Sequence, residues 1–273
     1  MRAAVTICLI PEAAAGPFVF HGDLVESCRS AKALGYDAVE IFLPNADAST
    51  TLQVKTIVAD YGLAVSAFGS GGGWLLHKLT LTSADAAIRT QAKDYIRRTM
   101  HAAAELNAPV IIGSLQGRHD GTVTKEQALA WLAEALQELS EDAASLNQPI
   151  FFEPLNRYET NLLTTLADTA AFLDQHGLTQ VKILADLFHM NIEEVSLPAA
   201  IRAAGGHIGH VHFADSNRLA MGLGHTAIEP IVQALRHVNY TGYLCAEVFP
   251  KPDAMRAATQ TMTAIRHFTG AST

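Results

Sequence analysis

Four potential metal ligands each end a short apolar run in the second half of the sequence: Glu153, Asp186, His212 and Glu247. They are 33, 26 and 35 residues apart, so about one strand–helix unit separates each from the next. A single acidic residue after a strand often caps a helix, but capping does not explain four in register. Two glutamates, one aspartate and one histidine form a mainly oxygen donor set, which suits Mn²⁺, Mg²⁺ or Co²⁺ better than structural zinc. Because unpaired carboxylates are costly to bury, we expect one bound divalent cation.

Such a site suits proton transfer at a carbon atom next to a carbonyl group. A Lewis acid stabilises the enediolate oxygen, and a carboxylate can act as the base at the carbon. Epimerisation removes a proton from one face of the carbon and returns one to the other face, so it requires two opposed carboxylates. Glu153 and Glu247 could supply this arrangement. A 1,2-isomerase could work with one base, so the pair favours an epimerase but leaves an isomerase open.

A regular alternation of apolar, β-rich runs and helical stretches must position these residues. Strands are expected near residues 3–10, 37–43, 63–68, 109–114, 149–153, 181–186, 207–213 and 242–248. Helices are expected near 22–34, 51–61, 84–106, 125–145, 162–176, 196–204, 226–238 and 253–268. Eight such units, with no glycine-rich dinucleotide motif after the first strand, favour a closed (β/α)₈ barrel over an open doubly wound sheet. The 273 residues fit one barrel domain, 1–273, because such barrels typically take about 250 residues.

Several helices carry their own boundary signals. Ser83 and Thr160 are expected to cap helices, and Thr124 begins a capping box that ends at Gln127. Three glycines stand where helices should end: Gly35, Gly62 and Gly177.

Composition excludes several classes of partner. The formal net charge of −8 argues against a nucleic-acid partner, because binding to phosphates needs clustered Lys and Arg. The three scattered cysteines indicate neither a disulfide framework nor a thiolate zinc site, so we expect a reducing, cytoplasmic location. No segment approaches the roughly 20 apolar residues of a membrane span, so no membrane partner is expected. The apolar run from Ala3 to Ile10 is interpreted as the first strand rather than a signal peptide, since Pro11 and Glu12 interrupt it.

Three segments carry a resemblance to a known family. They are Glu153–Glu159 (EPLNRYE), Asp186–His189 (DLFH) and His212–Arg218 (HFADSNR). These resemble the xylose-isomerase-like TIM-barrel superfamily, and within it the branch of ketose 3-epimerases and keto-gluconate epimerases. The resemblance covers nearly the whole chain and is strongest between Glu153 and Glu247.

The resemblance implies an isomerase, a metal-dependent epimerase of a ketose or keto-sugar acid. It implies that one divalent ion, Mn²⁺ before Mg²⁺ or Co²⁺, is bound by Glu153, Asp186, His212 and Glu247. Glu153 and Glu247 would also be the catalytic acid/base pair. Three further residues would hold substrate oxygens near the carbonyl: Glu159, His189 and Arg218. A homo-oligomer, a dimer or a tetramer, is implied as well.

Other residues near the expected strand ends leave alternatives open. The glycines of Ser70–Trp74, together with Arg118, could bind a carboxylate or phosphate of the substrate, or the two loops could form a lid. Trp74 could stack on a sugar or pack within that lid. Glu159 could instead cap a helix that starts near Asn161.

The remaining polar residues have weaker assignments. Glu40 ends the second strand pattern and could face the site, without a clear role. His210 points the same way as His212 and is expected either to pack in the core or to support that ligand. Arg157 is left unassigned.

Three other functions are alternatives to the epimerase. An aldose–ketose isomerase of the hydroxypyruvate-isomerase type would share the fold and the metal. A nuclease similar to endonuclease IV would need extra histidines, whereas the fourth strand ends Ile111–Ser114 and Arg218 is followed by Leu219–Gly222, without an Asp-x-His pair. A non-catalytic sugar-binding protein is disfavoured because all four expected ligands and both bases are present.

Overall fold

Eight parallel strands form a closed barrel in the computed structural model, which describes residues 1–270. The strands are β1 (Arg2–Cys8), β3 (Ala38–Phe42), β4 (Ala64–Gly69), β5 (Val110–Ile112), β6 (Ile150–Phe152), β7 (Val181–Asp186), β8 (Ile208–His212) and β9 (Tyr243–Ala246). Each strand pairs with the next, and β1 also pairs with β9, which closes the sheet. These strands match the eight expected ranges closely and confirm the expected (β/α)₈ TIM barrel.

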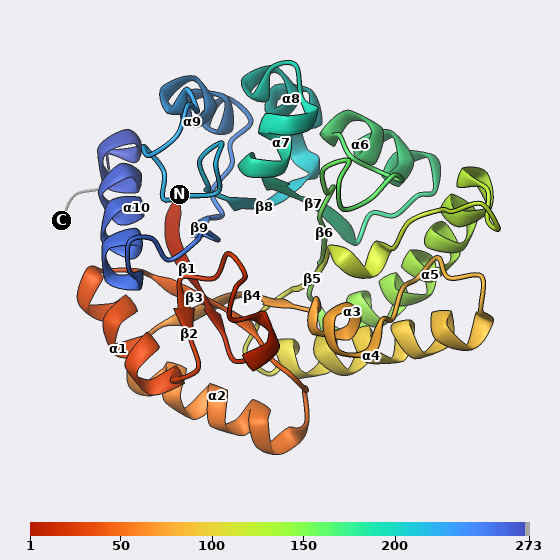
Figure 1. Ribbon diagram of the computed structural model, residues 1–273, viewed down its shortest axis with the longest axis horizontal. Helices are drawn as coiled ribbons and strands as arrows, with labels where there is room; N and C mark the ends of the chain where they lie inside the picture. Colours follow the sequence, from red (N-terminus) through yellow and green to blue (C-terminus); the bar gives the residue numbers. More distant parts are fainter. Residues whose placement is uncertain (271–273) are drawn as a thin grey trace.

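Helices surround the barrel, with the strands at the centre (Figure 1). The eight expected helices are α1 (Leu24–Leu34), α2 (Ala48–Asp60), α4 (Ala86–Ala104), α5 (Lys125–Leu146), α6 (Leu166–Gln175), α8 (Leu197–Ala204), α9 (Ile228–His237) and α10 (Ala254–Thr269). Shorter elements that the sequence did not predict are η1 (Pro11–Ala13), β2 (Phe20–His21), α3 (Gly72–His77), η2 (Ser114–Gln116), α7 (Leu187–Glu193) and η3 (Gly205–His207). No helix within residues 1–270 is long and apolar enough to cross a membrane.

Most of the predicted helix boundaries are confirmed. The side-chain oxygen of Thr124 accepts a hydrogen bond from the backbone N–H of Gln127 at 3.2 Å and so caps α5. All three predicted glycines have positive φ angles within two residues of a helix end, a conformation that glycine adopts without strain: Gly35, Gly62 and Gly177.

Two predicted caps are wrong. Thr160 does not begin a helix, because its hydroxyl donates to the carbonyl of Gly117 in a neighbouring loop at 2.8 Å. The helix that follows, α6, is capped by Thr165 instead. Ser83 lies two residues before Asp85, which is the actual cap of α4. The hydroxyl oxygen of Ser83 accepts a hydrogen bond from the backbone N–H of Asp85 at 3.2 Å. In both cases the hydroxyl forms a hydrogen bond within a loop and does not cap the helix that the local sequence predicted.

The interior of the barrel changes from apolar to polar along its axis. Alternate residues of each strand point inward. One inward cluster consists of Ala4, Ala38, Tyr243 and Cys245, and another of Ala67, Ile111, Phe151 and Leu184. Two residues after Ala38 on the same face of β3 lies Glu40, which is fully buried. The small alanines leave room for polar side chains between these clusters and the carboxyl ends of the strands.

Candidate active site

The structure brings together all four side chains that the sequence suggested as metal ligands. Glu153 directly follows β6, Asp186 and His212 end β7 and β8, and Glu247 directly follows β9. All four are buried, and one ligand-type atom from each lies within 4.8 Å of the others. Consecutive parallel strands end at the same rim of the barrel, so residues at equivalent positions must converge there.

Three carboxylates converge on one nitrogen of the His212 ring. The Nδ1 atom lies 3.3 Å from Oε2 of Glu247, 3.4 Å from Oδ2 of Asp186 and 3.5 Å from Oε1 of Glu153. Burial alone would lower the pKa of His212, but Glu247 and the other surrounding carboxylates raise it well above its usual value. This concentration of negative charge attracts a cation.

Three buried atoms in this region have no hydrogen-bond partner: Oε1 of Glu153, Nε2 of His189 and Nε of Arg218. Buried polar atoms without partners are costly, so they indicate a position where a ligand completes the site. The oxygen-rich donor set and the orphaned carboxylate oxygen fit a divalent cation such as Mn²⁺ or Mg²⁺.

The two glutamates of the site differ in their electrostatic surroundings. Burial raises the pKa of Glu153, and the nearby charge of Glu247 raises it further, against the opposing effect of His212. Burial would also raise the pKa of Glu247, but the charges of His212 and Arg218 outweigh it and lower the pKa.

Below these carboxylates lies a second buried cluster of Glu40, which the sequence left without a clear role, and His210, for which it left core packing and support of His212 open. Glu40 on β3 accepts hydrogen bonds from Nε2 of His210 at 2.7 Å and from Nε2 of His212 at 3.0 Å. Burial would raise the pKa of Glu40, but the charge of His212 and the hydrogen bonds of both histidines lower it to about 2. An ionised carboxylate only accepts hydrogen bonds, so Nε2 of His212 carries the proton on that side. His210 is held from the other direction by Phe151, with parallel rings and centroids 5.3 Å apart.

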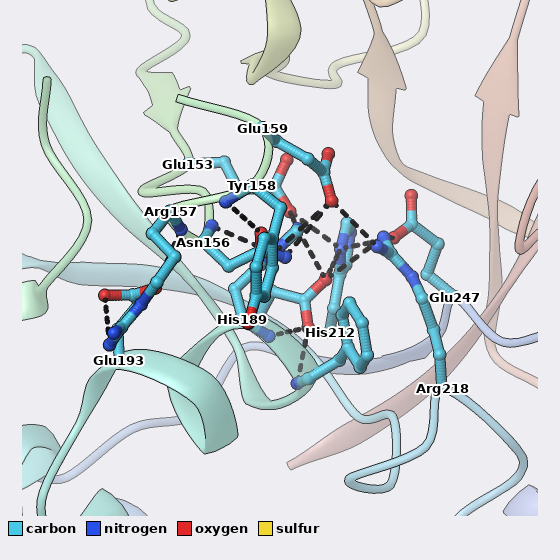
Figure 2. Close-up of polar contacts among 12 residues, drawn as sticks. Glu153, Asn156, Arg157, Tyr158, Glu159, His189, Glu193, His212, Arg218 and Glu247 are labelled. Atoms are coloured by element: carbon cyan, nitrogen blue, oxygen red, sulfur yellow. Dashed lines mark hydrogen bonds and ion pairs between the residues drawn. The ribbon is translucent and has the colours of Figure 1, made fainter. Parts of the chain in front are cut away.

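Arg218 reaches the site from the loop after β8. Its Nη2 atom lies 2.5 Å from Oε2 of Glu247 and 3.5 Å from Oδ2 of Asp186. The guanidinium carbon lies 4.7 Å from the ring centroid of Phe188, a cation–π contact. These contacts hold a mostly buried positive charge beside two carboxylates (Figure 2).

Asp215 organises the loop that carries Arg218. Its carboxylate accepts four backbone N–H groups, at 2.7 to 3.0 Å, from Ser216, Gly222, Gly224 and Thr226. Arg218 itself has a φ angle of 60°, which is uncommon for a residue other than glycine. The backbone geometry of this loop is therefore maintained by one buried acid, another residue that sequence reasoning did not single out.

His189 lines the cavity, and Asn156 contacts its ring. Nδ1 of His189 lies 3.2 Å from the backbone nitrogen of Asn156 and 2.7 Å from its side-chain nitrogen. Because the backbone N–H can only donate, Nδ1 accepts and the ring proton lies on Nε2. This Nε2 atom is 3.7 Å from Oε1 of Glu153, so His189 directs an N–H group toward the site (Figure 2). Asn156 was not predicted; its place after Glu153 in the same loop was the available signal.

Glu159 lies at the rim of the site. Its Oε1 atom is 3.8 Å from Nη1 of Arg218 and 3.9 Å from Nδ1 of His189. The alternative that it caps a helix is wrong, since the next helix in the described chain, α6, begins only at Leu166. Arg157 points away to the surface, where it pairs with Glu193 at 2.9 Å (Figure 2).

The site opens into a cavity of about 310 Å³. Glu153, Glu247, His189 and Arg218 line it, and apolar side chains form much of the remaining wall: Ile10, Phe18, Phe42, Leu75 and Leu155. Trp74 also lines this cavity, whereas Arg118 lines only a neighbouring one. Few polar groups at the bottom of a mostly apolar hollow are typical of small-molecule sites.

Two of the three glycines before Trp74 have a packing role, which neither of the two alternatives for this loop, an anion cradle or a lid, had included. Gly72 and Gly73 begin α3, and a Cβ atom at either would lie within 3.0 Å of the Tyr95 side chain. The close approach of α3 to Tyr95 therefore requires these glycines.

The chain matches known proteins over most of its length. Residues 28–265 match the family model described as the xylose isomerase-like TIM barrel. D-psicose 3-epimerase of Agrobacterium fabrum is 34% identical over 80% of this chain and 76% of its own length. 3-Dehydro-D-guloside 4-epimerase of Escherichia coli is 29% identical over 84% of this chain and 88% of its own. A crystal structure of D-psicose 3-epimerase in the presence of D-fructose superimposes with a TM-score of 0.83 at 26% identity, covering 99% of this chain and 100% of that one.

These relatives are sugar epimerases, which confirms the predicted enzyme class, the isomerases. Because the family model matches more than half of the chain and the fold is a barrel, the protein belongs to the xylose isomerase-like TIM barrel family.

Proposed function

We propose that this protein is a divalent-metal-dependent epimerase that exchanges the proton at C3 of a ketose or keto-sugar acid. The observation that supports this most directly is the convergence of Glu153, Asp186, His212 and Glu247 at the bottom of the cavity. The family supports it too, because the similar proteins include several ketose 3-epimerases and a 4-epimerase.

Glu153, Asp186, His212 and Glu247 would together hold one cation, for which Mn²⁺ is our first choice and Mg²⁺ or Co²⁺ the alternatives. When bound, the cation would stabilise the negative charge that develops on the substrate oxygen during proton removal. The orphaned Oε1 atom of Glu153 would then gain a partner.

Glu153 and Glu247 are the proposed acid/base pair. Their strands, β6 and β9, are separated in the barrel wall by β7 and β8, so the two carboxylates approach the cavity from different sides. Figure 2 shows them on either side of His212. One carboxylate removes a proton from one face of C3, and the other returns a proton to the opposite face. Arg218 holds Glu247 in place for this role through its hydrogen bond to Oε2.

Three residues are proposed to bind the substrate oxygens. His189 directs its Nε2–H group into the cavity, and Arg218 presents its guanidinium beside it. Glu159, at the rim, can accept a hydroxyl hydrogen. Trp74 forms part of the wall against which the sugar carbon atoms would pack.

Incubation of the purified protein with Mn²⁺ in D₂O tests this proposal. The incubation includes a panel of ketoses, keto-sugar acids and sugar phosphates, and NMR measures deuterium and products in each. We expect deuterium to enter C3 of at least one compound, with its C3 epimer appearing, and EDTA to abolish both until Mn²⁺ is restored. Deuterium and a product change at C1 or C2 would instead identify an aldose–ketose isomerase. Absence of exchange in every compound would refute the proposed chemistry.

A further inference from the structure

A second cavity adjoins the first at the mouth of the barrel. Its volume is about 480 Å³, larger than the 310 Å³ of the cavity above the carboxylates. The two share Trp74, Ser114, Leu155 and Glu159 in their linings. Ligand pockets span roughly 300 to 1,000 Å³, so the first cavity lies at the small end of that range and suits a single sugar. The second cavity therefore offers space that a free ketose does not need.

The lining of the second cavity combines hydroxyl groups with exposed aromatic rings. Hydroxyl side chains come from Thr80, Ser83 and Ser114. Trp74 and Tyr158, which are 42% and 76% exposed, are large aromatic side chains that the fold leaves open to solvent. An aromatic ring offers a flat apolar face to the carbon atoms of a sugar, while neighbouring hydroxyls bind its oxygens. This combination suits a hydroxylated ring.

The charges of the second cavity disfavour an anionic group. Arg118 is its one guanidinium, and two carboxylates, Asp120 and Glu159, also line it. A carboxylate or phosphate on the substrate would meet this negative balance and be repelled. A neutral group would form hydrogen bonds with donors and acceptors of both kinds.

The loop that contributes Ser114, Gly117 and Arg118 to the second cavity is hydrogen-bonded to the backbone of Glu153. Gln116 is fully buried, and its side-chain nitrogen donates to the carbonyl of Glu153 at 2.9 Å. Thr82 donates its hydroxyl to the carbonyl of Gln116 at 2.9 Å, and Thr160 donates to Gly117 at 2.8 Å. The second cavity is thus preformed and held at a constant position relative to the proposed acid/base pair, which lowers the cost of ordering a ligand across both.

We propose that the second cavity is a subsite for a neutral glycosyl group attached to the reacting keto-sugar. The protein then binds a keto-sugar that carries a second sugar more tightly than the free ketose. This rests on the proposed function, since it assumes that the keto-sugar occupies the first cavity.

Isothermal titration calorimetry of the full chain with Mn²⁺ tests the subsite without requiring turnover. The probes are D-fructose and two disaccharides with unsubstituted C1 to C3, a 6-O-glucosyl-fructose and a 4-O-galactosyl-fructose. We expect at least one disaccharide to bind about tenfold more tightly than fructose, the effect of one or two net hydrogen bonds. In Tyr158→Ala the ratio of the two Kd values should fall toward one. Tyr61→Ala, at the end of α2 and the opposite end of the barrel, is the matched control and should keep the ratio.

Equal affinity for fructose and both disaccharides would overturn the subsite, as would a disaccharide advantage that Tyr158→Ala leaves intact. Tighter binding of fructose 6-phosphate than of either disaccharide would overturn its neutral character. Because calorimetry reports binding alone, these results stand apart from the exchange of deuterium at C3, on which the proposed function depends.

Discussion

Two groups of buried acidic and histidine side chains occupy the barrel, and they differ in how fully their atoms are paired. The lower group is Glu40, His210 and Nε2 of His212, with contacts of 2.7 and 3.0 Å. The upper group consists of Glu153, Asp186, Glu247 and Nδ1 of His212. One oxygen of each carboxylate lies 3.3 to 3.5 Å from Nδ1 of His212, and Oε1 of Glu153 has no hydrogen-bond partner.

Buried acidic and histidine side chains can thus either stabilise the fold or bind a ligand. A fully hydrogen-bonded polar group is rigid, whereas an incompletely paired one is stable only when something completes it. His212 belongs to both groups, through different ring nitrogens. Glu40 therefore orients the ring so that Nδ1 faces the three carboxylates, as a carboxylate commonly does for a histidine ligand.

The largest expected effect comes from Glu247→Gln in the upper group. The amide cannot accept a proton, so we expect C3 deuterium exchange to slow by about 10²- to 10⁴-fold, with some Mn²⁺ binding retained. NMR in D₂O measures the exchange. Glu229→Gln on the surface of α9 is the matched control. Exchange at a near wild-type rate in Glu247→Gln would contradict the two-base mechanism.

Asp186→Asn should separate cation binding from folding. Oδ1 of Asp186 caps α7 by accepting the N–H groups of Phe188 and His189, and asparagine keeps that acceptor. Saturating Mn²⁺ at about 100 times Kd should stabilise the wild type by about 2.7 kcal/mol, or roughly 5–10 °C in Tm. Most of that shift should disappear in Asp186→Asn, although the Tm without metal changes little.

Asp23→Asn changes the N-cap of α1, which does not line the cavity above the upper group, and is the control for this measurement. It should keep the full Mn²⁺-dependent shift. If Asp186→Asn kept the shift as well, the upper group would not be the cation site.

Glu40→Gln tests the lower group. The amide can accept from only one histidine, and its NH₂ group would face the other, which disturbs the tautomer of His212. We expect the affinity for Mn²⁺, measured by calorimetry, to fall by about 10- to 100-fold. The Tm without metal should fall little or rise, since a buried charge is removed. A lower Tm with unchanged Mn²⁺ affinity would show that Glu40 only supports packing.

The smallest effect is expected from Asp215→Asn, which changes the loop that carries Arg218, the partner of Glu247 in the upper group. The amide nitrogen cannot accept the two N–H groups that one carboxylate oxygen now holds, so the loop carrying Arg218 should lose order. We expect a several-fold rise in KM with a smaller change in kcat. Steady-state kinetics on the substrate identified by NMR measures both. Unchanged KM would show that Arg218 keeps its position without this loop geometry.

Sequence reasoning located the barrel and the four converging residues because both depend on local patterns. Strand periodicity and the spacing of one unit suffice to place Glu153 and Glu247 at the same rim, whatever the details of the loops. The helix boundaries depended on the same local signals, and Thr160 shows where these fail, since its partner in the folded chain is 43 residues away.

The supporting residues could not be predicted because their partners are distant in sequence. Glu40 lies 170 residues from His210 and meets it only across the closed barrel. Its neighbours on β3 are apolar, so the sequence suggested only that Glu40 could face the site and did not show what it contacts. The four N–H groups that Asp215 accepts likewise depend on a loop conformation that no residue pattern specified.

The barrel divides its cavity between the two halves of the chain. The proposed reactive residues follow β6 to β9, whereas Ile10, Phe18, Phe42 and Trp74 on the facing wall come from the first third of the sequence. Exchanging the segments after β1, β3 and β4 with those of other barrels would alter which sugar fits while leaving the proton-transfer machinery untouched. Glu40 lies within β3 itself, so these exchanges would keep its contact with the ring of His212. The architecture thus suits directed evolution of sugar selectivity by segment swapping.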